Sequence, residues 1–315
     1  ANLDVETSEN SIQESIAQIY IQILYAAESV KVNENTLQVS IAQRDRGQEL
    51  LNAGSIAKSD LAQLEAQVST DRYQLVTAQA TLQDYKLQLK QLLELDGENE
   101  MNVYLPALSD ENVLLPLPTK KDVYMSALTL RPEIEASKLS VEASELGIDI
   151  AKAGYLPTIS LSAGIGTNHT SGSDFTFGEQ VKNGWNNSIG VSVSVPIFNN
   201  RQTKSAVQKA KLQRETSLLS LLDEQKTLYK TIEGLWLDAN SAQQRYAAAN
   251  EKLRSTQISY DLISEQFNLG MKNTVELLTE KNNLLQAQQE QLQAKYMAIL
   301  NTQLLKFYQG DKLAL

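Results

Sequence analysis

The sequence predicts a mainly α-helical protein of long antiparallel coiled-coil helices, with a β-hairpin inserted between two copies of a helix-turn-helix repeat. Three observations predict this fold class. Two long tracts contain no proline, two tracts match when the chain is shifted by 216 residues, and two short stretches alternate apolar with small or polar side chains. The chain of 315 residues is long enough for one large domain or two ordinary ones.

The positions of the prolines define the helical tracts. All six lie between residues 106 and 196, so residues 1–95 and 197–315 have none. Proline breaks helix interiors, and both tracts are rich in the helix formers Ala, Leu, Gln, Glu and Lys. Residues 199–269 are expected to form one helix of about 70 residues, roughly 105 Å long at 1.5 Å per residue. A rod of that length must bury its apolar stripe against neighbouring rods.

Heptad spacing supports coiled-coil packing of these rods. Apolar residues recur every seven positions at Leu61, Val68, Leu75, Leu82 and Leu89, and Asp71 is a polar exception in the intervening seam. The last tract carries two adjacent apolar rows, which suit a helix with neighbours on both sides. A closed ring of helices requires that arrangement, but a simple antiparallel bundle also fits the periodicity.

An internal duplication explains why the two helical tracts resemble each other. The shift of 216 residues aligns a Glu-x-x-Asn-x-Gly turn and the acid six positions after its glycine: Glu49, Asn52, Gly54 and Asp60 match Glu265, Asn268, Gly270 and Glu276. Two unrelated coiled coils would match only at scattered Leu and Ala positions. We therefore expect two related helical hairpins.

Period-2 alternation predicts two β-strands within residues 155–170 and 188–198. One face would carry the apolar side chains Ile159, Leu161, Ile165, Val191, Val193 and Val195, and the other small or polar residues. About eleven residues is the length of a membrane-spanning β-strand. Aromatic residues at both ends fit the interfacial girdles of an outer-membrane barrel, although they could also cap a small soluble hairpin.

The duplication also predicts that a matching hairpin belongs before residue 1, because the second helical tract follows residues 155–198. We expect the given chain to lack that first β-hairpin and part of a helix. A subunit with four strands would close a barrel only by oligomerising, since barrels need about eight strands or more.

The predicted segments follow from these signals. Residues 1–95 form the first-repeat helical hairpin, 96–131 a connector, 132–154 a helix, 155–198 the β-hairpin, 199–310 the second-repeat hairpin and 311–315 a C-terminal tail. Within the connector, Asp96–Asn99 has turn chemistry, and Thr119-x-x-Asp122 predicts a short helix over 120–130. Arg131-Pro132-Glu133 predicts a helix start, with proline in its first turn.

Composition excludes several classes of function. The 28 Lys and Arg residues against 38 Asp and Glu leave a net charge of −10, which argues against nucleic-acid binding. The absence of cysteine and the single His169 exclude thiolate sites and multi-histidine metal cages. No nucleophile motif or phosphate loop is present, so we expect neither an enzyme nor a cofactor nor a metal site. The sequence contains no run of 18 apolar residues, so no membrane-spanning helix is predicted.

In order and spacing, several short motifs resemble the TolC family of outer-membrane efflux channels. They are Arg131-Pro132-Glu133-Ile134, Tyr155-Leu156-Pro157 leading into a strand, Val195-Pro196-Ile197-Phe198 leading out of one, and the paired Gly-to-acid turns. The resemblance implies a homotrimer in the Gram-negative outer membrane, with a shared β-barrel in the lipid and a periplasmic tunnel of helices. It further implies a periplasmic adaptor (membrane fusion) protein and an inner-membrane RND, ABC or MFS pump as partners.

The resemblance also implies roles for the paired turns. Gly54 and Gly270 would lie at the periplasmic tip and meet the adaptor, and Asp60, Lys272 and Glu276 would belong to a charged gate. Thr279 replaces an acid found in some members. Three copies of Asp60 and Glu276 near one axis would form an acidic ring that attracts cations. An acid just after a turn glycine also stabilises a helix start by capping, and the two roles are compatible.

The predicted function is a passive exit duct of a tripartite efflux or type I secretion system, which carries drugs, ions or proteins. The main alternative is a soluble periplasmic coiled-coil adaptor or scaffold, which shares the long heptad hairpins. A hydrolase on a helical scaffold is a third class and would require a pocket with clustered, perturbed acids.

Overall fold

The computed structural model describes residues 1–95, 102–106 and 113–313, and it confirms the predicted fold class. The elements in chain order are α1 (Asn2–Asn52), α2 (Lys58–Leu92), α3 (Lys120–Leu130), α4 (Pro132–Ala153), β1 (Thr158–Gly166), α5 (Phe177–Gly184), β2 (Asn186–Ser194), α6 (Gln202–Asn268) and α7 (Thr274–Gln309). The helices expected over 120–130, from 132 and over 199–269 are all present. The turn predicted at Asp96–Asn99 lies outside the described residues, as do parts of the predicted connector and tail.

The chain divides into two compact units. The first comprises Ala1–Glu135 and Gln225–Leu315, and the second comprises Ala136–Glu224. Both boundaries fall within helices, one in α4 and one in α6.

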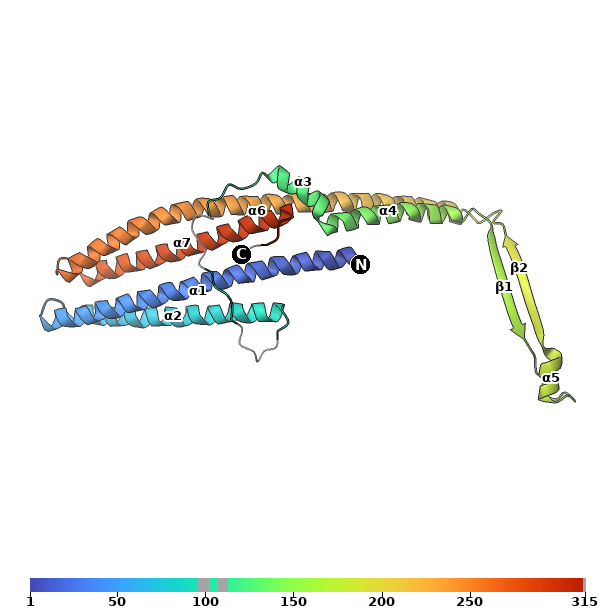
Figure 1. Cartoon of the computed structure of the whole chain (residues 1–315), viewed down its shortest axis with the longest axis horizontal. Helices are drawn as coiled ribbons and strands as arrows, with labels where there is room; N and C mark the ends of the chain where they lie inside the picture. Colours follow the sequence, from blue (N-terminus) through green and yellow to red (C-terminus); the bar gives the residue numbers. More distant parts are fainter. Residues whose placement is uncertain (96–101, 107–112, 314–315) are drawn as a thin grey trace. The chain divides into compact units, whose positions relative to one another are not determined.

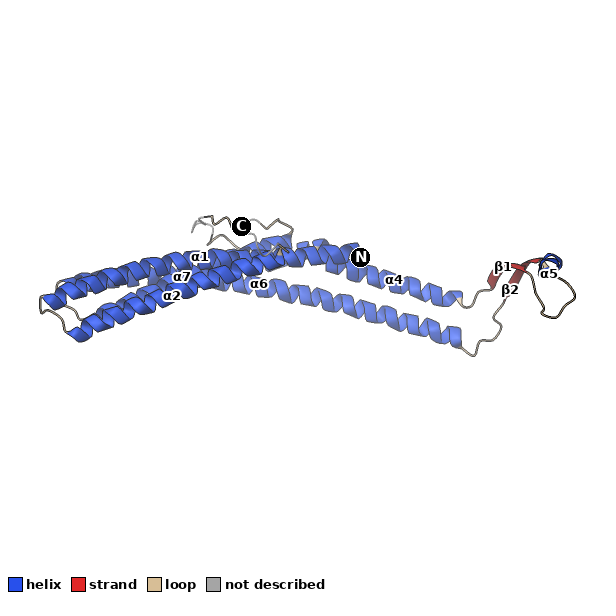
Figure 2. Cartoon of the chain, turned by 90° about the horizontal axis from the view of Figure 1, so that it is seen from below, coloured by secondary structure: helices blue, strands red, loops and turns tan. Residues whose placement is uncertain are grey.

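The first unit contains two helical hairpins, named here the first hairpin (α1 and α2) and the second hairpin (α7 and the part of α6 from Gln225 on). In each, two antiparallel helices lie side by side, and both turns lie at the same end of the unit (Figure 1, Figure 2). Helix α1 packs on α7, so the two hairpins share one core. The 67 residues of α6 form a helix without interruption, as its lack of proline predicts.

Two apolar clusters hold the hairpins together. The larger contains Ile21 and Leu24 of α1, Tyr246 of α6, and Ile299 and Leu304 of α7 among its buried residues. The smaller lies near the turns and takes one side chain from each of the four helices: Leu50, Leu64, Phe267 and Leu277. The turn ends of the two hairpins are therefore one packed structure.

Arg131 of the Arg-Pro-Glu motif holds the C-terminal end of the short helix α3 against α1 and α7. The Arg131 side chain is buried and donates a hydrogen bond to Glu14 of α1 at 3.2 Å. Its guanidinium carbon lies 3.6 Å from the ring centroid of Tyr308 and 4.7 Å from that of Phe307, both on α7. The Thr119 hydroxyl accepts from the Asp122 N–H and caps α3 as its Thr-x-x-Asp pattern predicts.

In the second unit, α4 packs beside the N-terminal part of α6, and the two helices lead into the β-hairpin. The hydroxyls of Ser144 and Ser217 are 2.7 Å apart, and Arg214 donates to Glu145 at 2.8 Å. Strands β1 and β2 pair antiparallel, with Ile159 opposite Val193 and Leu161 opposite Val191 (Figure 1).

Two details of the β-hairpin differ from expectation. Each strand has nine residues rather than about eleven. Pro157 lies just before β1 and Pro196 two residues after β2, and proline has no N–H to donate to a ladder. Val195, expected within a strand, therefore lies beyond the end of β2. The loop between the strands also contains an unpredicted helix, α5, whose Thr176 N–H donates to the Glu179 carboxylate at 2.9 Å. The Thr-x-x-Glu spacing at residues 176–179 is the sequence signal for this helix.

Candidate functional site: the paired helical turns

The two turns between antiparallel helices have the same backbone geometry. Gly54 has a φ of 72° and Gly270 a φ of 75°, in the left-handed region that glycine enters without strain. In the first turn the N–H groups of residues 53, 54 and 55 donate to the carbonyls of Glu49, Leu51 and Leu50. Residues 269, 270 and 271 repeat this pattern 216 positions later. The duplicated sequence thus folds into duplicated turns, each with the αL glycine expected at a helix C-terminus.

The acids after these glycines cap the helices that follow. The Asp60 carboxylate accepts from the Ala57 N–H at 3.0 Å, and the Glu276 carboxylate accepts from the Asn273 N–H at 3.2 Å. In the second turn the Asn273 side chain also accepts from the Glu276 N–H at 2.9 Å, which completes a capping box. Alanine at position 57 has no side-chain acceptor, so only half of that box exists in the first turn. Capping is therefore one role of both acids.

Lys272 and Glu276 form an ion pair, with 2.5 Å between the ammonium nitrogen and the nearer carboxylate oxygen. The hydrogen bond from Lys272 is the main cause that lowers the pKa of the Glu276 carboxyl, and the bond from the Asn273 backbone N–H lowers it further. Thr279 donates its hydroxyl to the Val275 carbonyl and takes no part in the ion pair. In the described part of the chain, no hydrogen bond or ion pair joins Asp60 to this group.

The turn ends of the two hairpins are also joined by polar contacts. Arg46 donates to the Asn268 carbonyl at 3.3 Å and forms an ion pair with Glu49 at 2.7 Å. One turn earlier on α1, the Gln43 amide donates to the Tyr260 hydroxyl of α6 at 2.7 Å. Burial is the main cause of the raised pKa of Tyr260. No sequence motif marks these contacts.

A buried charge pair lies behind the turns. Lys281 of α7 bonds both Asp71 of α2 and the Ser40 hydroxyl of α1, and Ser40 itself donates to Asp71. The other carboxylate oxygen of Asp71 accepts from the Gln67 amide at 2.9 Å. Burial lowers the pKa of the Lys281 ammonium, and the hydrogen bond that Lys281 donates to Asp71 opposes that change. Asp71 was recognisable in the sequence as the polar exception in an apolar seam, but its partner Lys281 was not.

The β-hairpin separates its side chains into two kinds. The cross-strand pairs Ile159–Val193, Leu161–Val191 and Ala163–Ile189 share one face, and Ser160–Ser192 and Ser162–Gly190 share the other. All six predicted membrane-facing residues are at least 60 % exposed. In a two-stranded sheet, both outer edges are left without hydrogen-bond partners in the sheet.

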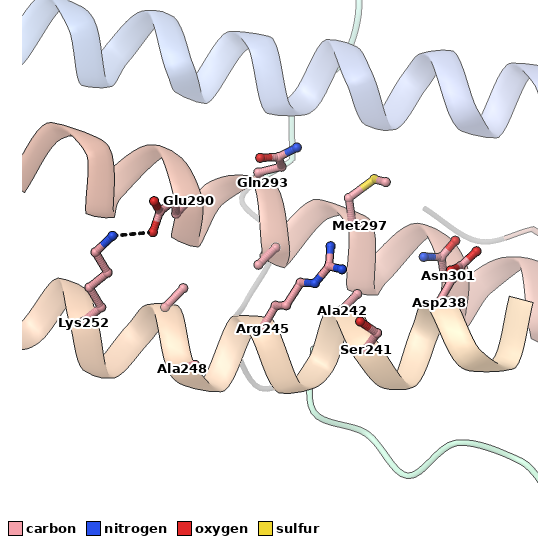
Figure 3. A pocket seen from close by; sticks show the side chains of 12 residues that line it. Asp238, Ser241, Ala242, Arg245, Ala248, Lys252, Glu290, Gln293, Met297 and Asn301 are labelled. Carbon is pink, nitrogen blue, oxygen red and sulfur yellow. Dashed lines mark hydrogen bonds and ion pairs between the residues drawn. The ribbon is translucent and has the colours of Figure 1, made fainter.

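The second hairpin also has an open groove between α6 and α7, with a volume of about 530 Å³ (Figure 3). Lys252 and Glu290 form an ion pair across it at 2.7 Å, and Arg245 extends along it. The lining residues Ser241 and Asn301 correspond to Tyr25 and Tyr85 of the first hairpin.

The described ranges contain no cluster of three or more residues suited to hold a metal ion. Among the helices of those ranges, none combines the length and apolar character needed to cross a membrane.

Comparison with known proteins identifies the family. A sequence model described as "Outer membrane efflux protein" matches residues 123–310, which is more than half of the chain. Outer membrane efflux protein BepC of Brucella suis is 25 % identical over 294 residues, covering 93 % of this chain and 61 % of BepC. Outer membrane protein TolC of Escherichia coli K12 is 25 % identical over 311 residues, covering 94 % of this chain and 60 % of TolC. The chain thus spans about six tenths of the length of these relatives.

Solved structures show the same fold. The outer-membrane channel OprN matches with a TM-score of 0.80 at 20 % identity, over 99 % of this chain and 68 % of its own. The structure of CusC matches with a TM-score of 0.83 at 19 % identity, over 99 % and 71 %. The predicted resemblance is confirmed, and the family consists of channel proteins rather than enzymes. This chain belongs to the outer membrane efflux protein family.

Proposed function

We propose that copies of this chain form a passive exit duct through the outer membrane, with the long helices in the periplasm. Drugs, ions or proteins delivered by an inner-membrane pump would pass through it. The observation that carries this proposal is the β-hairpin, in which exposed apolar side chains cover one face and small polar side chains the other. A hairpin in a soluble protein would bury its apolar face, whereas lipid covers that face in a membrane sheet and water covers the polar one.

The open edges of this hairpin support assembly with further strands. Unpaired backbone groups cannot remain in the hydrocarbon region, because each costs several kcal/mol there. Strands from other copies, or from parts of the protein outside this chain, would close the sheet. The homotrimer implied by the family resemblance satisfies this requirement.

The duplicated helices support self-association independently. Ile21 of α1 is 2 % exposed, but its counterpart Leu237 of α6 is 52 % exposed. Likewise Leu292 of α7 is 9 % exposed, and its counterpart Val76 of α2 is 58 % exposed. Within one chain α1 packs on α7, so the equivalent contact between copies places α6 of one copy on α2 of the next. That contact would bury Leu237 and Val76, and it leads to a closed ring of helices.

The tip turns are the proposed entrance of the duct. Asp60 and Glu276 cap helices, and the same carboxylates repeated around an axis would form an acidic constriction. Such a ring attracts cations. Lys272 neutralises part of this charge through its ion pair with Glu276, so Asp60 would supply more of the field. Gly54 and Gly270 lie at the ends of the hairpins, where a periplasmic adaptor would dock.

The range of relatives is consistent with a duct whose cargo is set by the pump. The relatives include an alkaline protease secretion protein, AprF, and a cation efflux system protein, CusC, at 21 % and 24 % identity. We propose that specificity for cargo lies in the inner-membrane pump, of RND, ABC or MFS type, rather than in this chain.

Conductance in planar lipid bilayers tests the channel and the acidic entrance separately. The intact oligomer should give a small, cation-selective conductance, and Asp60→Ala/Glu276→Ala should weaken the selectivity. Asp84→Ala, which removes an exposed acid of α2 far from the turns, should leave selectivity unchanged. Equal selectivity in the wild type and the double variant would refute the acidic entrance but not the channel.

Membrane fractionation separates this proposal from a soluble periplasmic scaffold. The duct requires detergent to leave the outer-membrane fraction. A free periplasmic pool of the full-length protein, with no conductance from any reconstituted sample, would favour the scaffold.

A further inference from the structure

The charge pair between Lys281 and Asp71 is the most deeply buried ion pair in the described part of the chain. The side chains of Lys281 and Asp71 are 3 % and 2 % exposed. Ser40 and Gln67 complete the hydrogen bonding of the carboxylate. The pair joins the second hairpin, through α7, to both helices of the first hairpin.

Stability alone does not explain such a pair. Desolvating two charges costs about as much as their attraction returns, and apolar replacements of similar size are often equally stable. A charge left buried without its partner is strongly unfavourable. A buried pair therefore discriminates between partners that supply the opposite charge and partners that do not. Polar residues in coiled-coil cores specify register and pairing in this way.

The duplication shows what the pair discriminates. Under the shift of 216 residues, Lys281 corresponds to Glu65, Asp71 to Ala287 and Ser40 to Thr256. The two hairpins share their turns and apolar patterns but differ at all three positions. Glu65 is exposed on α2.

Each alternative pairing can be read from these counterparts. If the first hairpin of a second copy took the place of the second hairpin, Glu65 would face Asp71, two like charges in a buried site. If two second hairpins paired, Lys281 would face Ala287 and have no carboxylate. If the first hairpin of one copy paired with the second hairpin of another copy, Glu65 would lie opposite the Thr256 hydroxyl and would face no like charge.

We propose that Lys281 and Asp71 determine which hairpins pair, so that first and second hairpins alternate within the chain and between copies. The charge pair thereby disfavours pairing of a hairpin with the identical hairpin of a second copy. The proposal rests on the duplicated fold and is independent of what the assembled protein transports.

A gain-of-pairing experiment tests the role of charge. The chain has no cysteine, so a single Ala66→Cys, at the exposed counterpart of Asn282 under the shift of 216 residues, reports contact between two first hairpins through a short bismaleimide linker. Lys281→Met removes the partner of Asp71 within the chain. Adding Glu65→Lys then offers Asp71 a cation from a second copy. We expect Lys281→Met/Glu65→Lys to raise the cross-linked dimer roughly tenfold over Lys281→Met, a change of about 1.4 kcal/mol in pairing preference.

The matched control is Lys281→Met/Gln63→Lys, which adds the same charge on another face of α2. It should give no more dimer than Lys281→Met alone. Equal dimer yields from Glu65→Lys and Gln63→Lys would overturn the proposal.

A second variant keeps the test independent of a destabilised fold. Asp71→Leu/Lys281→Met replaces both charges with apolar groups, and its melting temperature should equal or exceed that of the wild type. The second hairpins of two copies of this variant can pair without burying an unpaired charge. An Asn282→Cys reporter should therefore give several times more cross-linked dimer than in the wild-type background. A well-folded double variant with unchanged dimer would show that the pair has no part in pairing specificity.

Discussion

The two turn glycines allow a sharp prediction, because their replacement by alanine affects stability only through backbone conformation. A Cβ built at Gly54 or Gly270 meets no atom within 4 Å, so alanine introduces no clash. Their φ values of 72° and 75° nevertheless place an L-residue in the left-handed region, at a cost of roughly 1–2 kcal/mol. Alanine also restricts the unfolded chain, which returns about 0.4–1 kcal/mol. Each Gly→Ala variant should therefore lose about 1 kcal/mol of unfolding free energy.

Gly234 in the interior of α6 is the matched control. A Cβ there also meets no atom within 4 Å, but the backbone is helical. Gly234→Ala should stabilise the protein by about 0.5–1 kcal/mol, so the same chemical change has opposite signs at the two sites.

Urea unfolding followed by far-ultraviolet circular dichroism measures these effects as midpoint shifts at constant m. The double variant Gly54→Ala/Gly270→Ala should lose the sum of the two single effects, and Gly54→Asn less than Gly54→Ala. The reasoning is refuted if Gly54→Ala stabilises the protein as Gly234→Ala does, or if it costs more than about 3 kcal/mol, beyond what backbone strain explains.

Three further predictions concern the packed core. Burial raises the pKa of Tyr308 to about 12, above its unfolded value, so its stabilising effect is complete below about pH 10 and is lost as the pH rises toward 12. The stability difference between the wild type and Tyr308→Phe should shift by about 1 kcal/mol against the wild type from pH 9 to pH 11, and a constant difference in urea unfolding would contradict this. Arg131→Ala should cost about 2–4 kcal/mol because it removes the buried guanidinium from the rings of Tyr308 and Phe307 and from the Glu14 carboxylate. Arg131→Lys should cost less, and equal losses in unfolding free energy would exclude the charge as the cause. Gly47→Ala should destabilise by about 1–2 kcal/mol, since its Cβ would lie 2.4 Å from a terminal carbon of Leu64, and Leu64→Val should recover part of the loss of melting temperature.

Local signals were sufficient for most of the fold and for the turns. The absence of proline predicted α6, the Thr-x-x-Asp cap predicted α3, and alternation predicted which residues share a face of the β-hairpin. The Glu-x-x-Asn-x-Gly pattern predicted the two turns, in which the structure gives Gly54 and Gly270 left-handed φ values. These signals work because helix, strand and turn geometry depend on residues within a few positions of one another.

Contacts between residues far apart in the chain leave little local signal. Asp71 was visible as an exception in its seam, but Lys281 lies 210 residues away and no short-range rule connects them. Strand β2 ends at Ser194 rather than near residue 198, since Pro196 has no N–H to donate to the ladder. Helix α5 was missed although Thr176 and Glu179 have capping-box spacing.

The helices, the β-hairpin and the duplication can be read from the chain alone, because each depends on periodicity and on backbone preferences that neighbouring residues set. Folding in three dimensions brings together the helices that share a core, Arg131 and Tyr308, and Lys281 and Asp71. Those contacts depend on packing and desolvation between surfaces far apart in the chain, and no local pattern encodes the partner of a buried charge.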